Sequence, residues 1–299
     1  MQCKIIKADC EEYLKHKTRK DGRHLFDLTF FDPPFNQGKD YQSHDDDMSH
    51  RAYWSWMKRL CTLIFKNTSA GGAIYFMQRE KNVQFVLEAL EDSGWTLQNV
   101  IVWKKKTSAV PCERKFGLQY QIIAFATKGK TPHVFNKLRI DPPLREGERI
   151  PRSHGIFVTD VWDDIRELTS GYFAGDEPFR DENQERSHKQ QSPVHLLARI
   201  ILSSSKVGDL IFDPFAGTGT TLVVAKQLSR NTVGVEIDHD YYSLIKNRIT
   251  TSRESDDILK YYRYYSFTES LSAIWPALLK KDSLRSDDFQ MNDPAKITS

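Results

Sequence analysis

The stretch LIFDPFAGTGTTLVVA, residues 210–225, joins two apolar runs through a glycine-rich turn. The first run favours a strand and the second has the length of a short helix. Gly217 and Gly219 let the backbone approach a ligand closely and leave the amino end of the helix free to hold an anion. The glycine spacing is not that of a dinucleotide site, and no lysine follows as in a nucleoside-triphosphate loop. The stretch therefore predicts a strand, a ligand-binding turn and a helix.

A second strand with an acid at its end follows this helix. VGVEID, residues 233–238, places Glu236 about 20 residues beyond the turn, the distance at which an acid binds the ribose hydroxyls in nucleotide-binding sheets. A structural turn in an ordinary α/β protein is the alternative. The two features together favour a site for a nucleoside-type ligand.

A third stretch, LTFFDPPFNQG at residues 28–38, ends an apolar run with an acid, two prolines and an aromatic residue. Proline donates no hydrogen bond to a strand ladder, so the strand ends here. Asp32 would stand at the end of a buried strand, where an unpaired carboxylate is costly. Since parallel sheets bind ligands beyond the carboxyl ends of their strands, we expect Asp32 to face the same site as the glycine turn.

The rest of the chain alternates strand and helix patterns, which predicts an α/β fold with a mainly parallel, twisted sheet covered by helices on both faces. Residues 97–103 and 118–127 read as two late strands. We expect a turn and then a strand over 71–77, and helices around 49–64, 80–94 and 192–205. Residues 130–187 break the alternation, and we interpret them as an inserted region or long loops outside the core. The resulting divisions are 1–129, 130–187, 188–252 and a C-terminal extension over 253–299.

Composition narrows the class of protein. The 299 residues are 39% hydrophobic and 28% charged, which is enough for a sizeable core. No apolar run has the length of a membrane span, and the first residues do not resemble a secretory signal, so we expect a cytoplasmic protein with no membrane partner. The four cysteines form no C-x-x-C pair, which argues against structural zinc or a disulfide framework. The net charge of +3 permits nucleic-acid binding without indicating it.

These motifs resemble those of DNA methyltransferases that methylate exocyclic amines with S-adenosyl-L-methionine, in the group whose catalytic motif precedes the cofactor motif (the β-class N6-adenine/N4-cytosine family). DPPF at 32–35 is similar to their D-P-P-Y/F signature, and DPFAGTGTT at 213–221 to D-P-F-x-G-x-G-T-T. KADCEEYL at 7–14 resembles a segment near the cofactor adenine, and 188–205 resembles the H-P-T-Q-K-P helix. In that helix Lys189, Gln190 and Ser192 depart from the pattern. The likeness runs from about residue 3 to residue 250.

The resemblance implies a Rossmann-like methyltransferase fold with an antiparallel late hairpin and a small inserted target-recognition region at 130–187. It implies S-adenosyl-L-methionine as cofactor and no metal. It implies a catalytic set of Asp32, Pro33, Pro34 and Phe35. The implied cofactor-binding residues are Asp9, Cys10, Asp32, His188, Gln191, Asp213, Pro214, Phe215, Ala216, Gly217, Thr218, Gly219, Thr220, Glu236 and Ile237.

The chemistry that the resemblance implies is methyl transfer to the amine of a base flipped out of double-stranded DNA. Asp32 and a backbone carbonyl of the Pro33–Pro34 turn would accept hydrogen bonds from that amine, and Phe35 would stack on the base. An Asp in the first position favours adenine N6. Cytosine N4, an RNA substrate, and a catalytically inactive binding subunit remain alternatives; the two intact motifs argue against the last.

Other features of the sequence are less specific. A second D-P-P at 141–143 ends in leucine, and we interpret it as a loop. Asp9 could cap a helix beside a buried thiol, and His188 could lie on the surface. Lys104, Lys105 and Lys106 could contact phosphate or end a solvated strand. We expect the tail tyrosines (261, 262, 264 and 265) to pack on the sheet or on a partner subunit. A homodimer and a separate cognate nuclease both stay open as partners.

Overall fold

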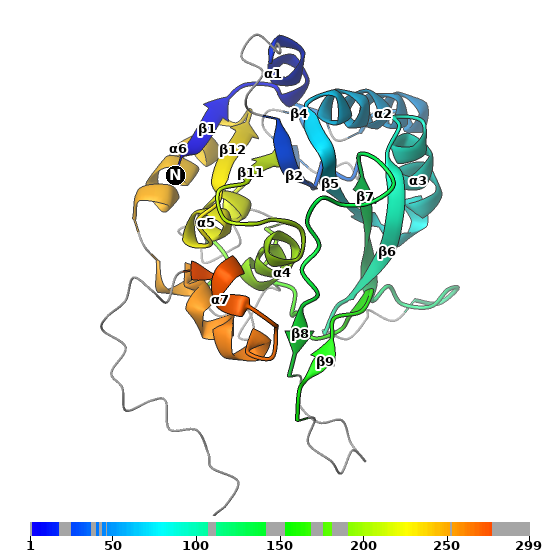
Figure 1. Ribbon diagram of the computed structural model, residues 1–299. Helices are drawn as coiled ribbons and strands as arrows, with labels where there is room; N and C mark the ends of the chain where they lie inside the picture. Colours follow the sequence, from blue (N-terminus) through cyan, green and yellow to red (C-terminus); the bar gives the residue numbers. More distant parts are fainter. Residues whose placement is uncertain are drawn as a thin grey trace, which may run out of the picture.

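An eight-stranded sheet forms the centre of the protein (Figure 1). The structure, a computed structural model, describes residues 2–17, 25–36, 40–41, 44–45, 47–106, 112–141, 153–168, 176–180, 191–251 and 253–276. The strand order is β1-β12-β11-β2-β5-β7-β6-β10. The strands are β1 (Cys3–Lys7), β2 (Phe26–Phe31), β5 (Thr68–Arg79), β6 (Thr96–Lys104), β7 (Tyr120–Thr127), β10 (Val161–Trp162), β11 (Leu210–Asp213) and β12 (Asn231–Glu236).

The sheet is parallel except where β7 lies. The pairs from β1 through β5 are parallel, β7 is antiparallel to both β5 and β6, and β10 is parallel to β6. The mainly parallel sheet with a late antiparallel pair, predicted from the alternating pattern and the resemblance, is confirmed. Two further pairs of two-residue strands stand apart from this sheet: β3 (Asp40–Tyr41) with β4 (His44–Asp45), and β8 (Arg139–Ile140) with β9 (Ile156–Phe157).

Helices cover both faces of the sheet, as predicted (Figure 1). One face carries α1 (Cys10–His16), α2 (His50–Lys66) and α3 (Val83–Glu91). The other carries α4 (Val194–Ser204) and α5 (Thr220–Gln227), while α6 (His239–Thr250) packs beside α5 and β1. Ser49 caps α2, because its Oγ accepts a hydrogen bond from Ala52 N at 3.3 Å. The apolar face of α2 is buried, in agreement with the helical spacing of the sequence.

The strand β5 begins earlier than the sequence predicted. The two glycines expected to form a turn lie inside β5, where the register with β2 shifts between Phe26 and Leu28. Gly71 has φ +72°, and its N–H donates to Lys128 O at 2.8 Å. A Cβ on Gly71 would lie 2.8 Å from His133 N, so only glycine fits where these two segments of the backbone approach each other. The turn prediction was wrong because a glycine bulge continues the strand.

Part of the region at 130–187 belongs to the core, which corrects the expectation that it lies outside. Strand β10 extends the sheet edge by pairing Trp162 with Trp103, and Ile165 is fully buried. Asp164 accepts hydrogen bonds from the buried Arg199 of α4, one of them at 2.8 Å from Nη1. This segment is therefore held on the sheet by a strand pair and a buried ion pair.

The C-terminal segment packs against helix α4. It contains the 3₁₀ helices η4 (Glu254–Asp256) and η5 (Ile258–Tyr265) and the short helix α7 (Leu271–Ile274); a further 3₁₀ turn, η2 (Glu80–Asn82), precedes α3. The rings of His195 and Tyr261 stack with centroids 4.2 Å apart, and Tyr265 is buried in the same cluster as α4. The tail aromatics thus contact a helix instead of the sheet. Along the described ranges, no helix is both long and apolar enough to cross a membrane.

Candidate active site

Four acidic residues gather at one edge of the sheet. Asp9 follows β1, Glu236 ends β12, Asp213 ends β11 and Asp32 follows β2. These four strands are parallel neighbours, so their carboxyl ends meet at the same edge. Pairing of β11 with β2, through Phe212 opposite Thr29, brings the glycine turn and the D-P-P-F turn side by side although they lie far apart in the chain. The sequence prediction that the two motifs share one site agrees with this placement.

The glycine turn has a backbone that requires glycine. Gly217 and Gly219 have φ +52° and +80°, in the left-handed region. Gly219 N donates to Ala216 O at 2.6 Å, and Gly219 precedes the first residue of α5. A Cβ on Gly219 would lie 3.0 Å from two side-chain carbons of Ile245. The turn therefore depends on glycine both for its conformation and for its packing on α6.

Glu236 closes the glycine turn from the neighbouring strand. Its Oε2 accepts a hydrogen bond from Gly217 N at 2.7 Å, and its Oε1 accepts one from Asp238 N at 2.9 Å. The side chain is 8% exposed, and burial raises the pKa of this carboxyl to about 7. A buried carboxylate beside a glycine turn can accept hydrogen bonds from the hydroxyl pair of a ribose.

Asp213 lies beneath the turn. Its Oδ1 accepts a hydrogen bond from Phe215 N at 3.1 Å, and burial raises the pKa of its carboxyl to about 6. Pro214, Ala216, Thr218 and Thr220 are also buried, while Phe215 and Gly217 are partly exposed. The predicted cofactor residues of this loop thus divide into an inner set that shapes the turn and an outer set that borders the site.

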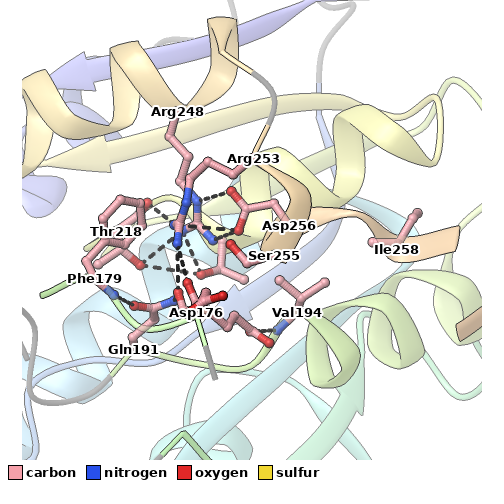
Figure 2. A network of polar contacts seen from close by, with 12 residues as sticks. Asp176, Phe179, Gln191, Val194, Thr218, Arg248, Arg253, Ser255, Asp256 and Ile258 are labelled. Atoms are coloured by element: carbon pink, nitrogen blue, oxygen red, sulfur yellow. Dashed lines mark hydrogen bonds and ion pairs between the residues drawn. The ribbon is translucent and has the colours of Figure 1, made fainter. Parts of the chain in front are cut away.

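Nothing in the sequence singles out Arg248, whose guanidinium bonds residues of the glycine turn (Figure 2). Its Nη1 donates to Thr218 O at 2.8 Å and to Thr220 Oγ1 at 3.0 Å. Its Nε and Nη2 donate to the two oxygens of Asp256 at 2.9 and 2.7 Å. This bidentate pair is buried, so the guanidinium has one fixed orientation. An arginine in the last turn of a helix is ordinarily interpreted as a favourable surface charge, which hid its role.

The D-P-P-F turn is held by a second set of contacts. Tyr53 OH donates to Pro34 O at 2.7 Å and accepts a hydrogen bond from Gln78 Nε2 at 2.9 Å. Asn36, at φ +53°, fixes the far side of the turn, because its side chain bonds both Met48 N and Met48 O at 2.7 Å. The prolines are thus one of several restraints that set the position of Asp32.

Asp32 also contacts the segment that precedes α4. Ser192 Oγ donates to Asp32 Oδ2 at 3.1 Å. Phe35, predicted to stack on a base, is only 4% exposed and belongs to the apolar cluster on the α4 face of the sheet. The structure therefore brings Asp32 and Phe35 to the predicted edge, with the ring of Phe35 covered in this arrangement.

The side-chain amide of Gln191 bonds other residues of the protein (Figure 2). Gln191 Nε2 donates to Glu177 O at 3.0 Å, and its Oε1 accepts from Phe179 N at 3.1 Å. Arg253 Nη2 donates to Asp176 O at 2.7 Å, and its guanidinium lies 3.9 Å from the ring centre of Phe179. The amide of Gln191 thus holds residues 176–180 against the segment that precedes α4, and its predicted cofactor contact stays a prediction.

The remaining predicted residues occupy distinct places. Asp9 caps α1, with Oδ1 accepting from Glu12 N at 3.0 Å, and burial raises the pKa of the Cys10 thiol well above its usual value. Ile237 is 45% exposed next to Glu236, where an apolar side chain can lie on a ligand ring. His188 lies outside the described residues.

A separate group of ionisable residues lies near the amino ends of the strands, at the edge of the sheet opposite the candidate site. Among the described residues, Asp27, His133 and Asp209 place their ligand atoms within 4.8 Å of one another. Asp27 Oδ1 already accepts from Ser69 Oγ at 2.9 Å, and Asp209 Oδ2 accepts from Lys206 N at 2.9 Å. Asp27 lies near the amino end of β2 and Asp209 directly precedes β11, so this group has no part in the candidate site.

Comparison with known proteins agrees with this geometry. The chain is 28% identical over 236 residues to the DNA adenine methyltransferase YhdJ of Escherichia coli K12, an alignment that covers 75% of this chain and 76% of the relative. The crystal structure of an M1.HpyAVI–SAM complex superposes with a TM-score of 0.55 at 21% identity, covering 83% of this chain and 99% of that one. The cytosine-N4-specific PvuII DNA methyltransferase gives 0.61 at 16% identity, covering 89% and 92%.

The family comparison covers both sequence motifs of the site. The sequence profile of the N6/N4 DNA methylases matches residues 26–247, a range that contains the D-P-P-F turn, the glycine turn and Glu236. The match spans well over half of the 299 residues. This chain is therefore a member of the N6/N4 DNA methylase family.

Proposed function

We propose that this protein is a DNA adenine-N6 methyltransferase that uses S-adenosyl-L-methionine. The observation that carries the proposal is the pairing of β11 with β2, which places the glycine turn beside Asp32 at one sheet edge. A nucleoside-type site and a turn that presents hydrogen-bond acceptors then share one edge of the sheet, as transfer between two bound molecules requires. The similar structure of M1.HpyAVI is a complex with SAM, which supports the choice of cofactor. The relative YhdJ is a DNA adenine methyltransferase, which supports adenine as the target base.

The residues present fit the cofactor. Gly217 and Gly219 have no side chains where a nucleoside must approach, and a Cβ at Gly219 would be crowded. The carboxylate of Glu236 would accept hydrogen bonds from the ribose hydroxyls, and Ile237 would lie on the adenine ring. S-adenosyl-L-methionine, when bound, supplies an electrophilic methyl group on a sulfonium. The protein's part is to hold the ribose and to keep the methyl group facing the D-P-P-F turn.

Asp32 and one backbone carbonyl would act on the target amine. The lone pair of an exocyclic amine is delocalised into the base, so the amine is a weak nucleophile. Two acceptors that bind its hydrogens localise the lone pair on nitrogen and direct it toward the methyl group. Pro34 O already accepts from Tyr53 OH at 2.7 Å, so we assign the second acceptor to the carbonyl of Pro33. The amine becomes acidic only as it gains the methyl group, so Asp32 need not be a strong base.

Phe35 would stack on the flipped base. Because the ring is covered in this arrangement, stacking requires its neighbours on the α4 face to move when DNA binds. Base flipping itself is expected, since the target amine is paired inside the duplex. The ring then contributes stacking free energy, on the order of 1–3 kcal/mol for a base on an aromatic side chain.

The inserted region at 130–187 would contact the DNA. Arg139 lies with its guanidinium 4.0 Å from the ring centre of Phe157, which is itself exposed, on the β8–β9 pair. Lys104 and Lys106 are exposed where β6 ends, beside the strand β10 that belongs to this region. Such groups would bind phosphates and set the register of the duplex, while base edges specify the sequence.

Cytosine N4 is the second candidate for the target. An Asp at the first position of the D-P-P-F turn and the adenine enzyme YhdJ support adenine. The similarity in fold to the cytosine-N4-specific PvuII enzyme supports the alternative. The amine chemistry and the roles of Asp32 and Pro33 are the same for both bases.

The test uses purified protein, labelled S-adenosyl-L-methionine and mixed-sequence plasmid DNA, followed by nucleoside mass spectrometry. N6-methyladenine in the digest would support the proposal. N4-methylcytosine would change the target base to cytosine and leave the proposed mechanism unchanged. Label in RNA alone, or no transfer by protein that binds the cofactor, contradicts it. The Asp32→Ala variant is the control: we expect transfer to be lost and cofactor affinity, measured by calorimetry, to be kept.

A further inference from the structure

We propose that Ser192 is a positioning residue for Asp32, and that residues 176–180 set its place. This inference deepens the proposed function and rests on it. Ser192 is one of the positions at which the chain departs from the H-P-T-Q-K-P pattern, so the motif assigns it no role. The structure shows its hydroxyl donating to Asp32 Oδ2 at 3.1 Å across 160 positions of the chain.

The hydrogen bond restricts a rotation that would otherwise be soft. The terminal torsion of an aspartate has a broad, two-fold distribution, so the side chain alone does not fix the direction of its oxygens. A hydroxyl that donates to one oxygen selects one orientation of the carboxylate plane. A bond to a charged acceptor is roughly twice as strong as one between neutral groups, so it holds that orientation well. A carboxylate has about four lone-pair sites, so it can accept a hydrogen from the target amine as well as one from Ser192.

Ser192 is itself rigidly placed. It is 8% exposed and is followed by Pro193, whose φ of −65° is fixed by its ring. Helix α4 starts at Val194, and all of its residues are buried. A side chain attached to such a start cannot move far without disturbing the core. The Ser192 hydroxyl is therefore held at one position relative to the Asp32 carboxylate.

Residues 176–180 anchor the chain on both sides of Ser192 (Figure 2). On one side, Gln191 bonds Glu177 O and Phe179 N at 3.0 and 3.1 Å. On the other, Glu177 Oε1 accepts from Val194 N at 2.6 Å and so caps α4 with a residue from another part of the chain. The end of the inserted region thereby holds Ser192, and through it the direction of the Asp32 carboxylate.

A matched pair of serine variants tests the proposal. Ser192→Ala removes the bond to Asp32, and Ser192→Thr keeps a hydroxyl at the same place. Ser204→Ala is the control, since it removes a buried hydrogen bond, 2.7 Å to Tyr75 OH, at the other end of the same helix. The readouts are the single-turnover rate of methyl transfer to DNA, the Kd for S-adenosyl-L-methionine, and crystal structures that show the Asp32 side chain.

We expect Ser192→Ala to lower the single-turnover rate by about 10- to 100-fold, the range that follows when a reacting group is misplaced by up to 1 Å. Its Kd should stay within about twofold of wild type, Asp32 should adopt a different or mixed orientation, and Ser192→Thr should recover most of the rate. Ser204→Ala should transfer at the wild-type rate. These results would support the positioning role.

Two outcomes would overturn it. Ser192→Ala could keep the wild-type rate and an unchanged Asp32, or it could lose rate only in step with cofactor affinity. A wild-type protein that transfers no methyl group to DNA would instead refute the proposed function. The crystal structures still decide the inference in that case, because the orientation of Asp32 in Ser192→Ala does not depend on any substrate.

Discussion

Tyr53 donates its phenolic hydrogen to the carbonyl oxygen of Pro34 at 2.7 Å, and so ties the D-P-P-F turn to helix α2. The same hydroxyl accepts from Gln78 Nε2 at 2.9 Å on strand β5. A turn at the end of β2 is thereby fixed to a helix on one face and to the adjacent strand. The position of Asp32 depends on this buried tyrosine as well as on the two prolines that precede Phe35.

The first prediction concerns this tyrosine. Tyr53→Phe keeps the ring and removes the hydroxyl, so we expect a loss of about 1–2 kcal/mol in the free energy of unfolding. We also expect a three- to tenfold fall in the single-turnover rate with an unchanged Kd for the cofactor. Tyr75→Phe is the control, because it removes a buried phenol bonded to Ser204 away from the turn. Equal rates in the two variants would contradict the assignment.

The second prediction concerns the glycine turn. Gly219→Ala should unfold at lower temperature and bind the cofactor weakly, because its φ of +80° costs an L-residue about 1–2 kcal/mol and its Cβ meets Ile245. Gly208 has a similar φ of +87° with open space around it, so Gly208→Ala measures the backbone cost alone. Differential scanning fluorimetry measures the unfolding temperature of each variant, and calorimetry measures its cofactor affinity. If adding Ile245→Ala to Gly219→Ala restores nothing, the packing argument is wrong.

The third prediction concerns Arg248. Arg248→Lys keeps the charge but loses the fork that joins the Thr218 backbone to Asp256, so we expect the cofactor Kd to rise about tenfold. Arg199→Lys is the matched control, since Arg199 is also buried and paired with an acid, but away from the glycine turn. It should lower stability and leave the Kd unchanged. A similar rise in Kd for both variants would point to general destabilisation.

The fourth prediction concerns Asp213 and follows from its pKa of about 6 in the folded state, above the usual value of 3.8. The folded state binds this proton more tightly than the unfolded state. The stability from this group is therefore present below about pH 4 and is lost as the pH rises through 6. The free energy of unfolding of Asp213→Asn should exceed that of wild type by about 3 kcal/mol at pH 8, and the difference should vanish near pH 4. Urea unfolding across this range tests the sign.

The fifth prediction concerns Glu236, whose pKa is raised to about 7 by burial. If its carboxylate binds the ribose, the cofactor Kd should rise about tenfold between pH 8 and pH 6, as the ionised fraction falls. Glu236→Gln should bind weakly with little dependence on pH over the same range. Calorimetry of both proteins gives the difference. A parallel pH dependence in the two would assign the effect to another group.

The sequence was sufficient for features that depend on local patterns. Alternating strands and helices, such as the helix predicted around 49–64 and observed as α2, follow from periodicity and from residue preferences at helix ends. The edge at which Asp32, the glycine turn and Glu236 meet follows from a general rule about parallel sheets. These predictions needed no knowledge of which side chains contact each other.

The sequence was insufficient where long-range contacts decide the outcome. Arg248, Tyr53 and Ser192 are ordinary residues of helices or their flanks, and only the assembled fold shows what they bind. Strand β5 runs through two glycines because pairing on both sides outweighs their weak preference for strands. The tail tyrosines could not be assigned to α4, since any apolar face of the fold would have served equally well.

The order of strands in the sheet has a consequence for synthesis. Cys3 pairs with Thr232, and Leu28 pairs with Ile211, so the first strands of the chain have neighbours made only near its end. Contacts between such distant parts form slowly because a long loop must close first. Until β11 and β12 leave the ribosome, one edge of β2 and the edge of β1 that pairs with β12 lack their partners. The site at the strand ends is therefore assembled last, and a nascent chain cannot modify DNA before nearly the whole domain has been made.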